Sequence, residues 1–267
     1  MMDLFSTCLI FTSLFVTTTC QLSGEFATEV EGVRLAYHVD KDGDVSLSAE
    51  GPDGRRVRGT SFPLREVSSQ LDTDGFFSTK YTVDFGRRRF RGLRQRKFLR
   101  PVSLLFPQAN FENGDLTDPV FTDFGIVFAS FQGQQLQFLW NTRTLSPGVF
   151  RFRETTGDLN EVTSSIDSDG RVEINFSCRG LEGVSAIFSL EEGRFPYRLY
   201  FTRSTRGISI VTFRQDVVEL CGIDDFDGER ADRLFRVLAF ADEDRVYMSY
   251  PIPGRNSILL PLDRIVN

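Results

Sequence analysis

Apolar and polar residues alternate along most of this chain with a period of two, which predicts β-strands. In the first half, the alternation runs through Leu35, Tyr37 and Val39 and resumes at Val45 and Leu47. An Asp-Gly step, Asp42-Gly43, separates the two runs, and such a step between alternating strands predicts a tight hairpin turn. The second half shows the same alternation at Val172, Ile174, Phe176, then Val184, Ala186, Phe188, Leu190, then Tyr197, Leu199, Phe201.

One segment departs from this period and predicts a helix. Ile210, Phe213, Val217 and Leu220 recur at helical spacing, and Gly222 follows them as a stop signal. The corresponding segment of the first half contains Pro101, which makes it a weaker helix candidate.

The two halves of the chain resemble each other in sequence. "DKDGDVSL" at Asp40–Leu47 returns as "DSDGRVEI" at Asp167–Ile174. Five further matches follow the same order, and each preserves the apolar positions: Gly24 with Gly148, Phe62 with Phe188, Tyr81 with Tyr197, Arg91 with Arg206, and Val127–Trp140 with Val237–Tyr250. A tandem duplication explains this order best.

The duplication predicts the fold class and the domains. We expect a mainly β protein made of two tandem antiparallel β modules, each a small sandwich or barrel with at most one helix. The boundaries are a signal peptide at 1–20, a first module at 21–141, a linker at 142–147, a second module at 148–252 and a C-terminal extension at 253–267. The strand expected at Ile258–Leu262 has no counterpart in the first copy and is free to pair with either module.

The N-terminal residues read as a secretory signal. Leu9–Val16 is an apolar run, the small polar residues of "TTTC" follow it, and the run is too short to span a bilayer. A lipid anchor at Cys20 is disfavoured because three threonines precede it. We therefore expect an extracellular, secreted protein without a membrane span.

The turn sequence that begins at Asp40, with its alternating acids and glycine, also raises the question of a calcium loop. An EF-hand loop that begins at Asp40 requires glycine at its sixth position and glutamate at its twelfth, where this chain has Val45 and Gly51. The second copy places Arg171 where Asp44 stands in the first. The sequence therefore predicts a turn here, and no metal site.

Two cysteines and one asparagine are candidates for covalent modification. Cys178 and Cys221 lie outside the predicted signal and form either one disulfide or two buried thiols. Asn175 begins the tripeptide Asn-Phe-Ser on the outward face of its strand, where a glycan can be attached.

Composition leaves little room for catalysis. The chain has one histidine, His38, whose alternation places it on the outer face of its strand, and we expect it to be an exposed strand residue. The carboxylates Asp224, Asp225, Asp227 and Glu229 have the composition of a loop, because the first copy does not keep the individual acids. We predict a non-enzymatic protein without a cofactor.

A basic segment is the strongest candidate site. Residues 87–100 carry eight cations and no acid: Arg87, Arg88, Arg89, Arg91, Arg94, Arg96, Lys97 and Arg100. Because the whole chain has a net charge of −6 and this segment contributes eight positive charges, the remainder carries −14. The segment is either an anion-binding site, a processing site or a solvated face.

These observations favour a secreted binding or surface protein that contacts an acidic polysaccharide or acidic surface through residues 87–100. Nucleic acid is disfavoured by the predicted compartment and by the overall acidity. A second hypothesis is a carrier of small apolar ligands, because each copy opens with Gly-x-Phe and continues as hairpins, which is similar in outline to calycin-type barrels. A third is a hydrolase that uses Asp or Glu. The sequence leaves the oligomeric state open.

Overall fold

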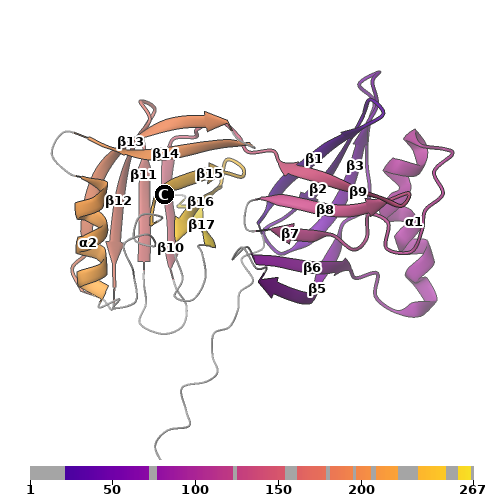
Figure 1. Ribbon diagram of the computed structural model, residues 1–267, viewed down its shortest axis with the longest axis horizontal. Coiled ribbons are helices and arrows are strands. Elements are labelled where there is room, and N and C mark those ends of the chain that lie inside the picture. Colours follow the sequence, from indigo (N-terminus) through magenta and orange to yellow (C-terminus); the bar gives the residue numbers. More distant parts are fainter. Residues whose placement is uncertain are drawn as a thin grey trace, which may run out of the picture.

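The protein forms two antiparallel β-barrels in tandem, each of eight strands (Figure 1). The computed structural model describes residues 22–71, 77–122, 125–153, 161–178, 181–194, 197–205, 209–221, 234–250 and 258–265. The predicted fold class is therefore confirmed, and the choice between sandwich and barrel falls on the barrel.

The first barrel is a meander that closes on itself. Its strands are β1 (Gly24–Val30), β2 (Val33–Val39), β3 (Asp44–Glu50), β5 (Phe62–Leu71), β6 (Phe77–Val83), β7 (Val120–Thr122), β8 (Ile126–Phe131) and β9 (Gln134–Trp140). Closure comes from β1 and β9, which pair at Phe26 and Trp140. The short strand β4 (Arg56–Arg58) pairs with β3 outside the barrel circuit.

The second barrel follows the same course. Its strands are β10 (Gly148–Arg153), β11 (Glu161–Ile166), β12 (Arg171–Ser177), β13 (Val184–Arg194), β14 (Arg198–Ser204), β15 (Val237–Phe240), β16 (Arg245–Tyr250) and β17 (Ile258–Arg264). The predicted C-terminal extension supplies β17, which pairs with β16 and with β10 and so closes the barrel.

Each barrel has one helix in the same place in the strand order. The predicted helix of the second copy is α2 (Ile210–Cys221), which packs on β12 and β13. The first copy has α1 (Arg88–Leu105), a helix of 18 residues that packs on β3 and β4. Among the described residues, neither helix has the length and apolarity needed to cross a membrane.

Pro101 lies inside α1 and made this segment the weaker helix candidate in the sequence. The helix continues through Pro101, which is buried where the helix packs against the barrel. Proline removes one backbone N–H and thus frees the carbonyl four residues earlier, at Lys97. Gly59 lies against this turn, and a Cβ at Gly59 would meet the Phe98 carbonyl oxygen at 2.6 Å and that of Lys97 at 3.3 Å. Tertiary packing therefore offsets the helix-breaking tendency of the proline.

The two hairpin turns that revealed the duplication have the same geometry. In the first, the Asp40 carboxylate accepts hydrogen bonds from the amides of Asp42 and Asp44 at 3.0 and 2.9 Å, and Gly43 has a φ of 85°. In the second, Asp167 accepts from the amides of Asp169 and Arg171, both at 2.9 Å, and Gly170 has a φ of 77°. The predicted turns are confirmed.

One of the six sequence matches is out of step by one strand. It aligned Val127–Trp140, which forms β8 and β9, with Val237–Tyr250, which forms β15 and β16. Chain order around the barrels instead equates β9 with β17, because these strands close the two circuits on β1 and β10. The C-terminal segment therefore has a structural counterpart in the first copy. The error arose because every strand carries the same alternation, so a shift by a whole strand preserves the pattern.

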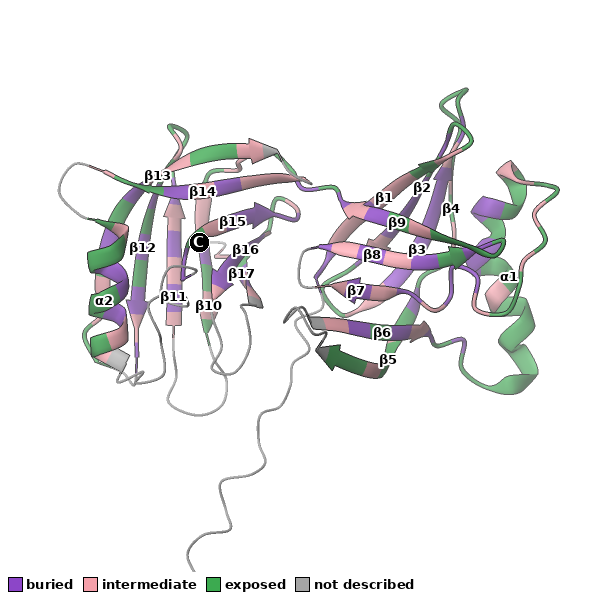
Figure 2. Cartoon of the chain, viewed as in Figure 1, coloured by how far each residue is buried: buried purple, intermediate pink, exposed green. Residues whose placement is uncertain are grey.

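Buried positions recur along the strands of both barrels (Figure 2), and many of the buried residues are aromatic. Buried rings of the first core include Phe26, Tyr37, Phe98, Phe138 and Trp140. Those of the second include Phe150, Phe176, Phe188, Phe213 and Phe240. Among the described residues, thirteen phenylalanines are buried and thus have the simple role of core residues.

The two barrels share a packed interface. Tyr247 and Ala239, on the outer face of the second barrel, belong to the buried cluster of the first barrel. The Tyr247 hydroxyl accepts a hydrogen bond from the Ser23 amide at 2.7 Å, and its ring lies 5.2 Å from that of Trp140. The linker is held as well, since the amide of Arg143 donates to the Phe240 carbonyl at 2.8 Å. These contacts join the barrels directly, in addition to the linker.

Candidate functional site

Helix α1 carries seven of the eight predicted anion-binding residues, and Arg87 precedes it as the N-cap. Phe98, Leu99, Pro101 and Val102 hold only its C-terminal half against the barrel. The N-terminal turns project into solvent, so the eight cations are all exposed (Figure 2). The structure therefore places the predicted residues together on the exposed turns of one helix, and we call this set the basic face of α1: Arg87, Arg88, Arg89, Arg91, Arg94, Arg96, Lys97 and Arg100.

The cations of the basic face have no acidic partner among the described residues. All the ion pairs found among the described residues join side chains of other elements. Arg94 donates to the Phe85 carbonyl at 3.1 Å, and the Arg89 guanidinium lies 5.8 Å from the centre of the Phe90 ring. The positive charge of the face is thus not compensated by acidic side chains in the part of the chain that the structure describes.

An apolar stripe runs beside the basic face. Phe90, Leu93 and Leu104 are 49, 58 and 47 % exposed. Their spacing of three and eleven residues places them on one side of the helix, over a length of about 21 Å at 1.5 Å per residue. Large apolar side chains in such an exposed row are unusual for a helix that only faces water.

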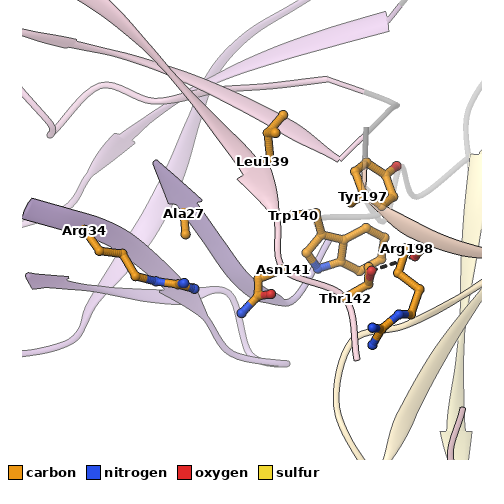
Figure 3. Close-up of a pocket in the computed structure, with 8 residues that line it drawn as sticks. All are labelled: Ala27, Arg34, Leu139, Trp140, Asn141, Thr142, Tyr197 and Arg198. Atoms are coloured by element: carbon orange, nitrogen blue, oxygen red, sulfur yellow. Dashed lines mark hydrogen bonds between the residues drawn. The ribbon is translucent and has the colours of Figure 1, made fainter. Parts of the chain in front are cut away.

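A second candidate site lies where the two barrels meet (Figure 3). This inter-barrel pocket has a volume of about 380 Å³. The first barrel and the linker contribute six of its lining residues and the second barrel two: Ala27, Arg34, Leu139, Trp140, Asn141, Thr142 and, from the second barrel, Tyr197 and Arg198. Ligand sites are common at such junctions between modules.

Trp140, the only tryptophan of the chain, has an unpaired indole N–H in this pocket. The residue is 1 % exposed, and its Nε1 has no hydrogen-bond partner among the residues that the structure describes. Leaving a buried donor unpaired costs about 1–3 kcal/mol. The ring cannot easily turn to find a partner, because Phe26 stacks on it at 6.1 Å and Tyr197 meets its edge at 5.6 Å. A fixed, unsatisfied donor thus lies in a residue that lines the pocket.

A charged network adjoins the pocket on the outer face of β1 and β2. Glu25 lies at its centre and is paired with Arg34 at 2.5 Å and with Arg56 at 3.1 Å. Asn141 donates to the Glu25 carboxylate at 2.9 Å, and the Nδ1 of His38 lies 3.4 Å from it. Burial raises the pKa of Glu25, but the hydrogen bonds from Asn141 and Arg34 and the neighbouring positive charge outweigh burial, and the pKa lies below its usual value.

His38 is not the exposed residue that the sequence predicted. It does point outward, but its side chain is only 15 % exposed. Burial has the largest effect and lowers the pKa of His38. The charge of Glu25 raises this pKa, whereas the charges of Arg58, Arg56 and Arg34 lower it further, and the resulting pKa is about 4. The imidazole is therefore neutral at pH 7. The prediction failed because outward residues of β2 are covered by long side chains of neighbouring strands, which alternation alone does not reveal.

Glu25, His38 and Ser48 lie in the order of a serine-hydrolase triad. The distance from His38 Nε2 to the Ser48 hydroxyl is 2.7 Å, and the Nδ1 faces Glu25. However, Ser48 is only 3 % exposed and does not line the inter-barrel pocket, and Arg56 lies 3.3 Å from the same Nε2. A substrate has no path to the Ser48 hydroxyl in this arrangement. We interpret these residues as a polar network that joins β1, β2 and β3.

The remaining predicted sites are only partly covered by the structure. Cys178 is buried and disulfide-bonded, whereas the side chain of Cys221 lies outside the described residues, so their pairing stays a prediction. Asn175 is exposed on β12, as the alternation predicted, and its glycosylation also stays a prediction. The signal peptide and the acidic segment 224–229 lie outside the described residues. Across the described part of the chain, no group of three or more His, Cys, Asp or Glu residues is placed to hold a metal ion.

No protein-family model, curated protein or solved structure matches this chain. Function must therefore be inferred from the two sites themselves. The basic face of α1 was visible in the sequence as a run of like charge. The inter-barrel pocket was not, because its residues come from β1, β2, β9, the linker and the start of β14. The one available signal was the single tryptophan, which ends the first copy immediately before the linker.

Proposed function

We propose that this protein is an extracellular binding protein that docks on an acidic surface through the basic face of α1. The observation that carries the proposal is the uncompensated charge of the face: eight exposed cations with no acidic partner among the described residues. Such a face attracts an anionic partner.

The structure of α1 supports a role in binding because the helix is locally unfavourable. Arg87 at the N-cap makes no side-chain hydrogen bond to the first turn. That turn has no acid and begins with Arg88 and Arg89, so positive charge lies at the positive end of the helix dipole. Residues that break local rules of stability are frequent at functional sites. An anionic partner beside these turns removes the repulsion.

The apolar stripe favours an anionic lipid bilayer as the partner. Phe90, Leu93 and Leu104 gain nothing from a sulfated polysaccharide, which offers charge but no apolar phase. At a bilayer, cations contact the headgroups while an adjacent row of apolar side chains enters the acyl boundary. Only the bilayer uses both features of α1. Figure 1 shows α1 at the end of the first barrel that points away from the second, so a planar surface can approach it.

Vesicle sedimentation tests the proposal. The mature protein should bind vesicles of mixed phosphatidylserine and phosphatidylcholine and should not bind pure phosphatidylcholine. Changing Arg87, Arg88, Arg89 and Arg91 to Ser should weaken binding by about three orders of magnitude, since each basic residue near an anionic surface contributes about 1 kcal/mol. A matched control changes the exposed Arg151 and Arg203 of the second barrel to Ser and should leave binding unchanged.

A second variant separates the possible partners. Phe90→Ser with Leu93→Ser keeps every charge and should also weaken vesicle binding. In the opposite outcome, the Phe90→Ser, Leu93→Ser variant binds vesicles as well as the unaltered protein and is retained by a heparin column, while the arginine variant does neither. That result would identify the partner as a soluble polyanion. If the unaltered protein binds neither vesicles nor heparin, the proposed function is wrong.

A further inference from the structure

We propose that the inter-barrel pocket binds a small organic anion, a carboxylate or sulfonate with a flat apolar body. This site is separate from α1, which lies at the far end of the first barrel (Figure 1). The proposal therefore goes beyond the binding function of the basic face.

Two arginines approach the pocket from opposite barrels (Figure 3). The Nη2 of Arg34 is paired with Glu25, and the Nε of Arg198 is paired with Glu192 at 3.2 Å. A guanidinium has five N–H donors, so each arginine retains donors that these pairs do not use. Neither Nη group of Arg198 has a partner among the described residues. These donors are suited to a carboxylate or sulfonate.

The charge around the pocket is positive. Arg34, Arg56 and Arg198 lie at or near its walls, against the carboxylates of Glu25 and Glu192. His38, which faces Glu25, adds no charge at neutral pH. An anion that enters the pocket therefore meets a local excess of cations in a chain that is acidic overall.

Trp140 provides an independent indication of a ligand. Its Nε1 is buried and unpaired, and Figure 3 shows this nitrogen on the edge of the ring toward Asn141 and Thr142. Gly24 packs closely against this nitrogen, since a Cβ there would lie 2.6 Å from Nε1. Native proteins pair almost all buried donors, and an acceptor oxygen of a ligand is a suitable partner.

The other walls suit an apolar body. Ala27 and Leu139 are aliphatic, and the rings of Trp140 and Tyr197 meet at an angle of 65°. Burial raises the pKa of Tyr197, so its hydroxyl stays protonated and remains a donor. A few donors on an apolar, aromatic surface are the usual composition of a small-molecule site. The volume of about 380 Å³ limits the ligand to a compact molecule.

The single tryptophan makes the proposal directly testable. Trp140 is the only indole in the chain and lines the pocket, so its fluorescence reports on this site alone. The probe is 1-anilinonaphthalene-8-sulfonate, which carries a sulfonate on flat rings and quenches tryptophan by energy transfer. Titration into the mature protein should quench Trp140 to saturation, and an unlabelled aromatic carboxylate such as phenylacetate should reverse the quenching.

Three variants decide the outcome. Arg198→Ala should weaken probe binding by about tenfold or more, the effect of losing one charge-assisted hydrogen bond. Arg203→Ala removes an arginine from the same strand that pairs with Glu191 outside the pocket, and should have no effect. The variant with Arg87, Arg88, Arg89 and Arg91 changed to Ser should also quench normally, since it alters only α1.

The opposite results would overturn the proposal: quenching that does not saturate, equal binding by Arg198→Ala and Arg203→Ala, or loss of quenching in the α1 variant. If Arg198→Ala does not fold, Arg34→Gln on the opposite wall gives the same test, because Glu25 keeps Arg56 and Asn141 as partners. If the unaltered protein binds neither vesicles nor heparin but its Trp140 is still quenched to saturation, the proposed function of α1 is wrong and the pocket proposal stands.

Discussion

The neutral, buried His38 makes a quantitative prediction about stability and pH. Its pKa is about 4 in the folded protein and 6.5 when unperturbed. Because the folded-state pKa is the lower one, the unfolded chain binds more protons between these values, and stability falls as the pH falls from about 6.5 to about 4. The full difference corresponds to about 3 kcal/mol, and about 2 kcal/mol of it is lost by pH 5. This is a large fraction of a typical folding free energy.

His38→Gln isolates this effect. Glutamine cannot titrate but retains an amide that can donate to Glu25 and an oxygen that can accept from Ser48. We expect the variant to lose about 2 kcal/mol less than the unaltered protein between pH 7 and pH 5, in urea unfolding followed by Trp140 emission. The carboxylates are common to both proteins, and His38 is the only histidine, so the difference belongs to this residue. The pKa of Glu25 lies below its usual value, so its own loss of stability falls at lower pH.

Two results would refute the reasoning. One is a pair of stability curves that stay parallel from pH 7 to pH 5. The other is an imidazole proton resonance in the native protein that titrates near pH 6.5, which would show that His38 is solvated. Either result would mean that Arg56 and the neighbouring strands do not cover the ring.

Three further predictions concern local stability. Arg87→Ser should raise the melting temperature, because a serine N-cap contributes about 1 kcal/mol, and Arg88→Ser, which removes the same charge without forming a cap, should raise it less. Gly59→Ala should destabilise the protein by about 1–3 kcal/mol, because the new Cβ would contact the Phe98 carbonyl oxygen. Gly92→Ala, at an open position of the helix, should stabilise it by roughly 0.5–1 kcal/mol. Similar urea midpoints for the two variants would contradict the packing of α1. Asp40→Ala and Asp167→Ala should each lower the free energy of unfolding by about 1–2 kcal/mol, because each removes a carboxylate that accepts two backbone hydrogen bonds. Calcium should not shift the melting curve of the unaltered protein or of either variant, and a calcium-dependent shift would restore the metal interpretation.

The local features of the fold were predictable from short stretches of sequence. The alternation in β2, β3, β11 and β12 depends on the pleat, which places successive side chains on opposite faces. The Asp-x-Asp-Gly turns depend on one carboxylate and one glycine within four residues. The helix α2 depends on four apolar positions at helical spacing. Each of these is decided by neighbours along the chain, and each was confirmed.

The errors had a common physical origin in contacts between distant residues. Pro101 remains in a helix because α1 packs against the first barrel beside Gly59. His38 is covered because Arg56 and Glu25 reach it from other strands. The final repeat match slipped by one strand because alternation does not distinguish one strand from the next, and only barrel closure identifies β9 and β17 as equivalents.

Patterns along the chain were thus enough to predict that the protein is one β module written twice, with a basic segment in the first copy. Those properties depend on periodicity and on charge, which are local. The tertiary structure decided that the modules are barrels, that the basic segment is a helix with an apolar stripe, and that Trp140, Arg34 and Arg198 surround one pocket. The pocket could not be read from the chain because the packing of two barrels, and not any sequence interval, brings its residues together.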